Sequence, residues 1–193
     1  MDMDIKDLQD KLRDILPKKR YYHTLGVQYT CASLAMRYGL DINKAQVSGL
    51  LHDCAKYMKS SQILEKCKEL NMTISKTEEE HPHLLHGRLG AYYAKTIYGV
   101  DDLEILKAIE YHTTGHPDMS LLEKILFVSD YIEPGRKIVW GLEATRDAAF
   151  VDIDRAVVLK IESVLKYLND NDFFIDNITK ETYESYKEML INE

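Results

Sequence analysis

Side chains of two metal-binding types, four histidines and two aspartates, recur along this sequence. They are His23, His52, Asp53, His86, His112 and Asp130. Neutral imidazole nitrogens and carboxylate oxygens together suit transition-metal ions. A carboxylate buried without a partner costs several kcal/mol, and a shared cation removes that cost. The set therefore indicates a metal site in the protein interior.

The spacing of apolar residues places these six side chains on the buried faces of helices. Residues three, four or seven positions apart share one face of a helix. One such row contains His86, Leu89, Gly90, Tyr93 and Ile97, and another contains Ile105, Ala108, Ile109 and His112. The pair His52–Asp53 ends the apolar run VSGLL. We expect five helices to aim a histidine or aspartate inward.

The adjacent pair His52–Asp53 offers a nitrogen ligand and an oxygen ligand side by side. An aspartate has two oxygens and could bridge two metal ions, as two-metal hydrolases require. A His-Asp dipeptide is common, and a single histidine on an apolar face is usually a core residue. The argument for a metal site depends on the whole set.

Helical periodicity runs through almost the whole chain and predicts an all-α fold. We expect helices over residues 4–16, 19–38, 43–57, 61–70, 83–98, 102–113, 120–132, 142–149, 153–169 and 179–191. Gly39 and Gly99 are placed as helix C-caps, and Ser120 with Glu123 forms a capping box. The polar stretches 56–61 and 75–82 are expected to connect helices. We interpret residues 1–193 as one domain, with a motif-bearing core at about 19–140 and packing helices at about 141–193.

Composition excludes several classes of protein. A net charge of −7 argues against a nonspecific nucleic-acid binder. Cys31, Cys54 and Cys67 are an odd set without CxxC spacing, which favours small buried side chains in a reducing cytoplasm over disulfides or a thiolate zinc site. There is neither an apolar run of about 18 residues nor a signal peptide, so no membrane association is expected.

The order H…HD…H…H…D, together with five sequence segments, resembles a known family. The segments are RYYHTLGV (20–27), GLLHDCAK (49–56), LLHGRLGAYYAK (84–95), AIEYHTTGHPDMSLLEKILFVSDYIEPGR (108–136) and, more loosely, DIDRAV (152–157). The chain resembles the HD-domain phosphohydrolase superfamily, and within it the YqeK family, which hydrolyses bis(5′-nucleosyl) tetraphosphates symmetrically. The YHTTG and DYIEPGR strings distinguish this family from other HD proteins.

The resemblance implies two metal ions and a substrate. His23, His52, Asp53 and Asp130 would hold one ion, and Asp53 would bridge to a second ion held by His86 and His112. The family is associated with iron, while the ligand types alone leave manganese, zinc and cobalt open. The implied reaction is the cleavage of diadenosine tetraphosphate into two ADP by a metal-bound hydroxide near Asp53.

Several residues near the motifs are candidates for contact with this substrate. Lys56 follows Asp53 by three residues and could reach a phosphate during catalysis. Arg136 offers a guanidinium, which suits bidentate phosphate recognition. Thr113, Thr114 and Gly115 follow His112 and could line the site, and His116 and Arg88 are further candidates. His81 and His83 lie in a polar stretch and are expected in solvent.

Three alternatives remain open from the sequence. An HD enzyme could act on another nucleotide, such as a monoester, a deoxynucleoside triphosphate or a guanosine polyphosphate. A degenerate HD scaffold could instead sense nucleotide or metal without catalysis, although all six ligand positions are intact. The last helix, with Tyr183 and Tyr186, could cap the core or form a homodimer.

Overall fold

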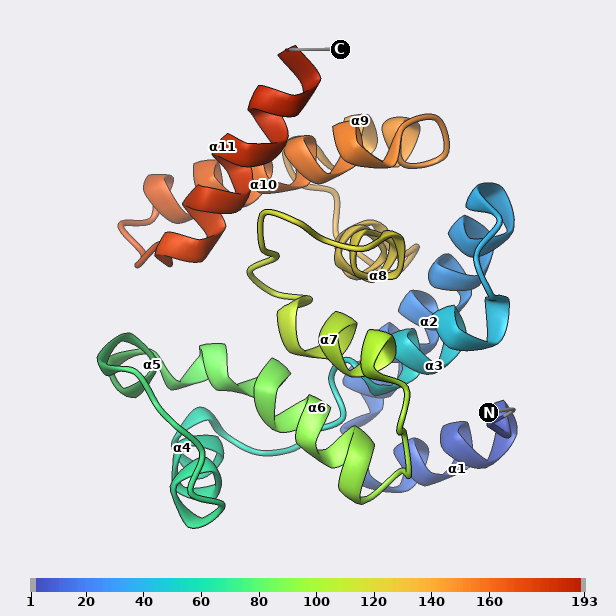
Figure 1. Ribbon diagram of the computed structural model, residues 1–193, viewed down its shortest axis with the longest axis vertical. Helices are drawn as coiled ribbons and strands as arrows, with labels where there is room; N and C mark the ends of the chain where they lie inside the picture. Colours follow the sequence, from blue (N-terminus) through green and yellow to red (C-terminus); the bar gives the residue numbers. More distant parts are fainter. Residues whose placement is uncertain (1–2, 192–193) are drawn as a thin grey trace.

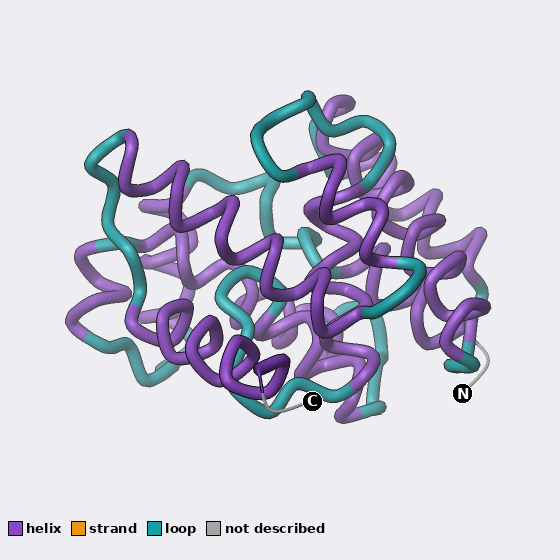
Figure 2. Tube along the Cα trace, turned by 90° about the horizontal axis from the view of Figure 1, so that it is seen from above, coloured by secondary structure: helices purple, strands orange, loops and turns teal. Residues whose placement is uncertain are grey.

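The computed structural model describes residues 3–191, and helices make up its regular structure. The elements are α1 (Ile5–Ile15), α2 (Lys18–Tyr38), α3 (Ile42–Leu51), α4 (Ser60–Glu69), α5 (Lys76–Glu80), the 3₁₀ helix η1 (Pro82–Leu85), α6 (His86–Thr96), α7 (Leu103–Tyr111), α8 (Leu121–Ile132), α9 (Leu142–Ala149), α10 (Ile153–Asp170) and α11 (Asn177–Ile191). Within these residues there is no β-strand (Figure 2). The expected all-α class is confirmed.

The helices form a bundle around α8, which is seen end-on near the middle of Figure 1. Helices α1 to α3 lie on one side of it, α4 to α6 below, and α9 to α11 above (Figure 1). Helix α8 contacts α2, α3, α7, α9 and α10. Segments far apart in the sequence therefore meet along one central helix.

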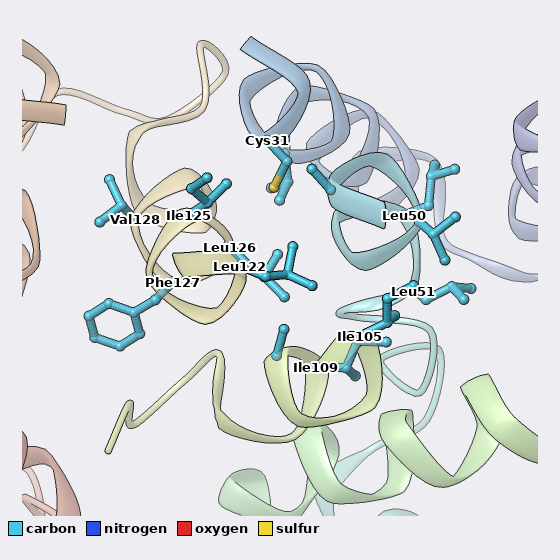
Figure 3. Packing of buried hydrophobic residues seen from close by; sticks show 14 of the residues in the cluster. Cys31, Leu50, Leu51, Ile105, Ile109, Leu122, Ile125, Leu126, Phe127 and Val128 are labelled. Atoms are coloured by element: carbon cyan, nitrogen blue, oxygen red, sulfur yellow. The ribbon is translucent and has the colours of Figure 1, made fainter. Parts of the chain in front are cut away.

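The core is built from the apolar rows that the sequence showed. Leu122, Ile125 and Leu126 of α8 belong to the same buried cluster as Cys31 of α2 and Ile109 of α7, while Leu50 lies on the side of α3 that is turned away from α8 (Figure 3). Phe127 points to the opposite side of α8 in the same view. Each of these side chains is at most 2% exposed. Burial of this kind stabilises the bundle by about 25 cal/mol per Å² of apolar area removed from water.

Local capping explains several helix ends. Ser120 accepts a hydrogen bond from the Glu123 N–H, and the Glu123 carboxylate accepts one from the Ser120 N–H, as the expected capping box requires. Gly39 ends α2 with φ of +70°, a conformation that glycine adopts without steric cost. Gly99 lies beyond the α6 C-cap, with φ of +74°.

Three of the expected segments differ from the structure. The helix expected over 43–57 ends at Leu51, and residues 52–57 form successive turns, closed by hydrogen bonds such as Lys56 N–H to Asp53 carbonyl. The connection expected over 75–82 contains α5, because Ser75 and Glu78 form a second capping box. The helix expected over 83–98 starts as η1 and stops at Thr96, so Ile97 is 60% exposed and not part of the buried row.

The three cysteines are buried and unpaired, as expected. Burial raises the pKa of Cys31 to about 12 and also raises that of Cys54, which keeps both as thiols. No helix among residues 3–191 is long and apolar enough to cross a bilayer.

The last helix caps the core, which is one of the two roles left open by the sequence. Tyr186 is 3% exposed, and its hydroxyl accepts a hydrogen bond from the Met119 N–H. The Tyr183 hydroxyl donates to Glu162 of α10. Self-association through α11 remains a prediction.

We expect Gly87→Ala to destabilise the junction of α6 and α7. A Cβ atom at Gly87 would lie 2.5 Å from the Glu110 carbonyl oxygen, a backbone atom that cannot move aside alone. Overpacking of this kind lowers the free energy of unfolding by about 1–3 kcal/mol. Denaturant unfolding measures the effect.

Gly90→Ala, one turn later on α6, is the matched control. Its Cβ would make an ordinary contact of 3.4 Å with the His52 carbonyl oxygen. Alanine also has the better helix propensity, by about 1 kcal/mol. Equal stability of the two variants would contradict the proposed close approach at Gly87.

Candidate metal centre

The six predicted ligands come together at the ends and inner faces of five helices. His23 lies in α2, His86 begins α6, and Asp130 lies in the last turns of α8. His52 caps α3 and His112 caps α7, so both lie at helix ends and not within helices as the spacing suggested. His52, Asp53, His86 and His112 are at most 2% exposed. This core position matches the interior site expected from the sequence.

Backbone carbonyls orient three of the imidazole rings. The Nδ1 atoms of His52, His86 and His112 lie 2.7, 2.5 and 2.7 Å from the carbonyl oxygens of Gly49, His83 and Ile109. A carbonyl oxygen only accepts, so each Nδ1 carries the proton and donates it. Each Nε2 is then an unprotonated nitrogen with an available lone pair, the form that binds metal.

These lone pairs converge on one another and on the aspartates. The Nε2 atoms of His86 and His112 are 3.1 Å apart, and both are 3.6 Å from Asp53 Oδ1. On the other side, Asp53 Oδ2 lies 3.2 Å from His52 Nε2 and 3.9 Å from His23 Nε2. The two oxygens of Asp53 thus face two different pairs of histidines.

Asp130 completes the second of these groups. Its Oδ1 lies 3.0 Å from His23 Nε2 and 3.8 Å from His52 Nε2. Ligand atoms of His23, His52 and Asp130 all lie within 4.8 Å of one another, as do those of His52, Asp53 and His112. Both groups have the size of a metal coordination shell.

Unpaired buried atoms show that these residues fit a cation. Among the described residues, His23 Nε2, His52 Nε2 and Asp53 Oδ1 are buried without a hydrogen-bond partner. A buried polar atom without a partner costs about 1–3 kcal/mol. Electron-rich atoms that face one another add repulsion to that cost. A cation between them removes both penalties, so this cluster could hold metal.

The electrostatics around Asp53 and His86 favour the forms that bind metal. Burial alone would raise the pKa of Asp53, but the surrounding imidazoles, His52 first, and the Lys56 cation outweigh it and hold this pKa well below 3.8. Burial, followed by the charge of Lys56, holds the pKa of His86 well below 6.5. Ionised carboxylates and neutral imidazoles are the forms that metals bind.

Glu133 supports His23 and was missed in the sequence. Its Oε1 lies 3.1 Å from His23 Nδ1, and the carboxylate is 4% exposed. A ligand histidine commonly donates its second N–H to a carboxylate in this way. Gly26 makes the approach possible, because a Cβ there would collide with the Glu133 carboxylate. The spacing of Glu133, three residues after Asp130, was the available signal.

Three cations surround the carboxylates. Lys56 Nζ lies 3.7 Å from Asp53 Oδ1, and Arg20 Nη1 lies 2.6 Å from Asp53 Oδ2. Arg136 Nη2 lies 2.6 Å from Asp130 Oδ1. The structure therefore places Lys56 and Arg136 beside the cluster, and their contact with phosphate remains a prediction. Arg20 was missed, although it precedes His23 by one helical turn.

The other predicted substrate contacts are divided between the cluster and its surroundings. Thr113 is exposed, and its Oγ1 lies 3.1 Å from His86 Nε2 and 3.3 Å from His112 Nε2. Thr114 bonds to the Gly115 carbonyl, and Gly115 is buried with φ of +66°.

His116 and Arg88 are held by acidic partners. His116 Nε2 lies 2.7 Å from Glu123 Oε1, and its ring packs edge-on against Tyr111. The Arg88 guanidinium donates to Glu78 of α5 at 2.6 Å. It is therefore held by α5, whereas the sequence suggested contact with substrate. Substrate contact by either residue remains a prediction.

A buried lysine connects the C-terminal helices to this cluster. Lys160 of α10 is 4% exposed and donates to the Phe127 carbonyl at 2.7 Å and to the His112 carbonyl at 3.5 Å. Burial lowers its pKa to about 7, against the opposing effect of Asp130. From its sequence, α10 was expected only to pack against the core. The place of Lys160 within the apolar row of Ala156, Val157 and Ile161 was the missed signal.

Comparisons with known proteins agree with this geometry. The HD domain family matches residues 20–135. A protein of Halalkalibacterium halodurans named bis(5′-nucleosyl)-tetraphosphatase, symmetrical, is 36% identical over 182 residues, which cover 92% of each chain. A Bacillus subtilis protein of the same name is 37% identical over 79% of this chain and 81% of its own.

A solved structure extends the similarity to the whole fold. It is described as a "predicted HD superfamily hydrolase involved in NAD metabolism" from Clostridium acetobutylicum. It is 38% identical, with a TM-score of 0.91 over 96% of this chain and 98% of that chain. The chain belongs to the HD domain family, and within it to the YqeK-type group whose named members are symmetrical bis(5′-nucleosyl)-tetraphosphatases.

Proposed function

We propose that this protein is a metal-dependent hydrolase that cleaves diadenosine tetraphosphate symmetrically into two ADP. The observation that carries the proposal is Asp53, whose two oxygens face two different histidine pairs in a buried cluster. The names of the relatives supply the substrate. Lys56 lies on one side of Asp53 and Arg20 lies on the other, which suits a substrate whose phosphates extend in both directions.

The ligand geometry supports a two-ion arrangement. His23, His52, Asp130 and Asp53 Oδ2 would hold one ion, while His86, His112 and Asp53 Oδ1 would hold the other. We propose iron, because a mixed shell of imidazole and carboxylate suits it; the same shell also accepts manganese, zinc or cobalt. When bound, the ions would supply positive charge to the phosphoryl oxygens and make a water more acidic.

The side chains around the ions would bind and orient the phosphates. Lys56 lies on the Oδ1 side of Asp53, and Arg20 lies on the Oδ2 side. Because carboxylate oxygens that bind metal are no longer free for these cations, we expect Lys56, Arg20 and Arg136 to turn toward phosphate. Thr113 offers a hydroxyl at the exposed edge of the cluster. Positive groups would thus line the tetraphosphate on both sides of the cut.

Symmetrical cleavage predicts ADP as the only nucleotide product. Chromatography of the products after incubation of metal-loaded protein with diadenosine tetraphosphate measures it, with elemental analysis of the same sample. ATP and AMP in equal amounts would show asymmetric cleavage and contradict the proposal.

The same experiment tests the other hypotheses from the sequence. Turnover of a nucleotide monoester, a deoxynucleoside triphosphate or a guanosine polyphosphate in preference to the dinucleotide would favour another HD-type hydrolase. Binding without turnover of any nucleotide would favour a sensing module.

We also propose that residues 1–193 act as one domain in the cytoplasm. Helix α10 supports the core directly, because Lys160 donates to carbonyls at the end of α7 and within α8. Three buried, unpaired cysteines suit a reducing compartment.

A further inference from the structure

Basic and aromatic residues outside the ligand set lie around the Oδ1 side of Asp53, and three contacts link them to the cluster and to one another. Lys56 lies closest, with its Nζ 3.7 Å from Asp53 Oδ1. His83 is exposed, and its carbonyl accepts the Nδ1 proton of the predicted ligand His86. The His83 ring lies 6.0 Å from the His81 ring. These residues therefore form a row that starts beside the metal cluster.

The row ends on an aromatic ring from a distant part of the chain. Phe174 belongs to the turn between α10 and α11, and its ring stacks on His81 with centroids 3.9 Å apart and planes at 12°. This turn is the end of the α10–α11 hairpin that lies above α5 in Figure 1. The contact makes His81 half-buried, so our expectation of a solvated His81 was wrong.

The Phe174 ring is held in place and still accessible. It is 42% exposed, although one face is stacked on His81. The part of this side chain that stays in water contributes nothing to the stability of the fold. A rigid, partly exposed ring is the feature that proteins use to stack nucleic-acid bases.

The order of chemical groups in this row matches the order of groups in a nucleotide. Lys56 supplies a cation beside Asp53, where phosphates would lie, and His83 stands between His86 and the stacked pair. The stacked ring lies beyond these groups, where the base of a nucleotide would lie.

We propose that Phe174, supported by His81, is a stacking platform for the nucleobase of one half of the substrate, with His83 and Lys56 directed at its phosphates. The proposal rests on the proposed function and adds a subsite to it. Stacking tolerates any base, because every base has a π-face. We therefore expect adenine and guanine nucleotides to bind this subsite with similar affinity.

Binding of the half-substrate ADP tests the platform, with pyrophosphate as the probe that lacks a base. Titration calorimetry on the metal-loaded protein measures both. Loss of one base–aromatic stack corresponds to about tenfold weaker binding. We expect Phe174→Ala to weaken ADP binding by about that factor and to leave pyrophosphate binding unchanged, because pyrophosphate does not reach the ring.

Phe173→Ala is the matched control. Phe173 is the adjacent phenylalanine, 54% exposed, and its ring packs against Tyr167 of α10 and not against His81. It should bind ADP like the wild type. Phe174→Trp keeps an aromatic ring and should retain ADP affinity, which separates stacking from a general change in the turn.

Two results would overturn the platform. One is unchanged ADP binding in Phe174→Ala, and the other is an equal loss of ADP and pyrophosphate binding. The proposed function fails separately, if the wild type releases no ADP from diadenosine tetraphosphate while the ADP titrations still report on Phe174.

Discussion

We expect Asp53→Asn to lose most of its bound metal and to reduce kcat/KM for diadenosine tetraphosphate by about 1000-fold, or about 4 kcal/mol. Asp53 is 1% exposed, and its two oxygens face different histidine pairs. An amide of the same shape has one oxygen and no negative charge. It cannot replace a carboxylate that serves both groups of ligands.

The measurement combines elemental analysis with steady-state kinetics. Asp154→Asn is the control, because Asp154 is also an ion-paired aspartate, 2.6 Å from Lys124 on the far end of α8. It should keep both metal and activity. If Asp53→Asn retained its metal content, Asp53 would be a buried acid that the histidines satisfy and not a bridging ligand.

Lys56→Ala should reduce kcat/KM by about 2–4 kcal/mol, which is about 30- to 1000-fold, while its metal content stays unchanged. The ammonium lies 3.7 Å from Asp53 Oδ1 and is one-third exposed, so it can reach a phosphate beside the ions. An ammonium has no lone pair and cannot be a metal ligand. Its removal therefore weakens the stabilisation of negative charge on the phosphate and leaves metal binding unchanged.

Two other variants make this experiment specific. Lys59→Ala removes an exposed lysine three residues later and should be silent. Arg136→Ala should raise KM more than it lowers kcat, if Arg136 grips phosphate equally in the ground and transition states. Full activity in Lys56→Ala would show that this lysine is a solvated surface residue without a part in catalysis. A loss confined to kcat in Arg136→Ala would place the arginine at the reacting centre.

The pattern of residue types along the chain determined the class of fold and the identity of the cluster. Apolar residues at helical spacing can bury their side chains only in a helical bundle, so the main helices were predictable from periodicity alone. His86 and Asp130 stood out for the same reason, because polar side chains within apolar rows need a partner in the core. The capping box at Ser120 was equally local and equally predictable.

Interactions between distant segments decided the features of the fold and the site that periodicity does not predict. The turns after Leu51 replaced a predicted helix, and periodicity does not report such a break because His52 and Asp53 are buried in either conformation. The tautomers of the histidines depend on which carbonyls lie beside their rings. The Glu133 contact with His23 joins residues 110 positions apart. Spacing in sequence says nothing about such contacts.

The metal ligands and the proposed stacking ring differ in how far the sequence predicts them. The metal ligands can be recognised in the sequence, because each is a polar residue next to the apolar residues of its own helix. Phe174 is one of several exposed aromatic residues in the sequence, and only its stacking on His81 links it to the residues that lead to the cluster. Local periodicity determines which side chains are buried, whereas the packing of α10 and α11 against the rest of the bundle determines which of them meet.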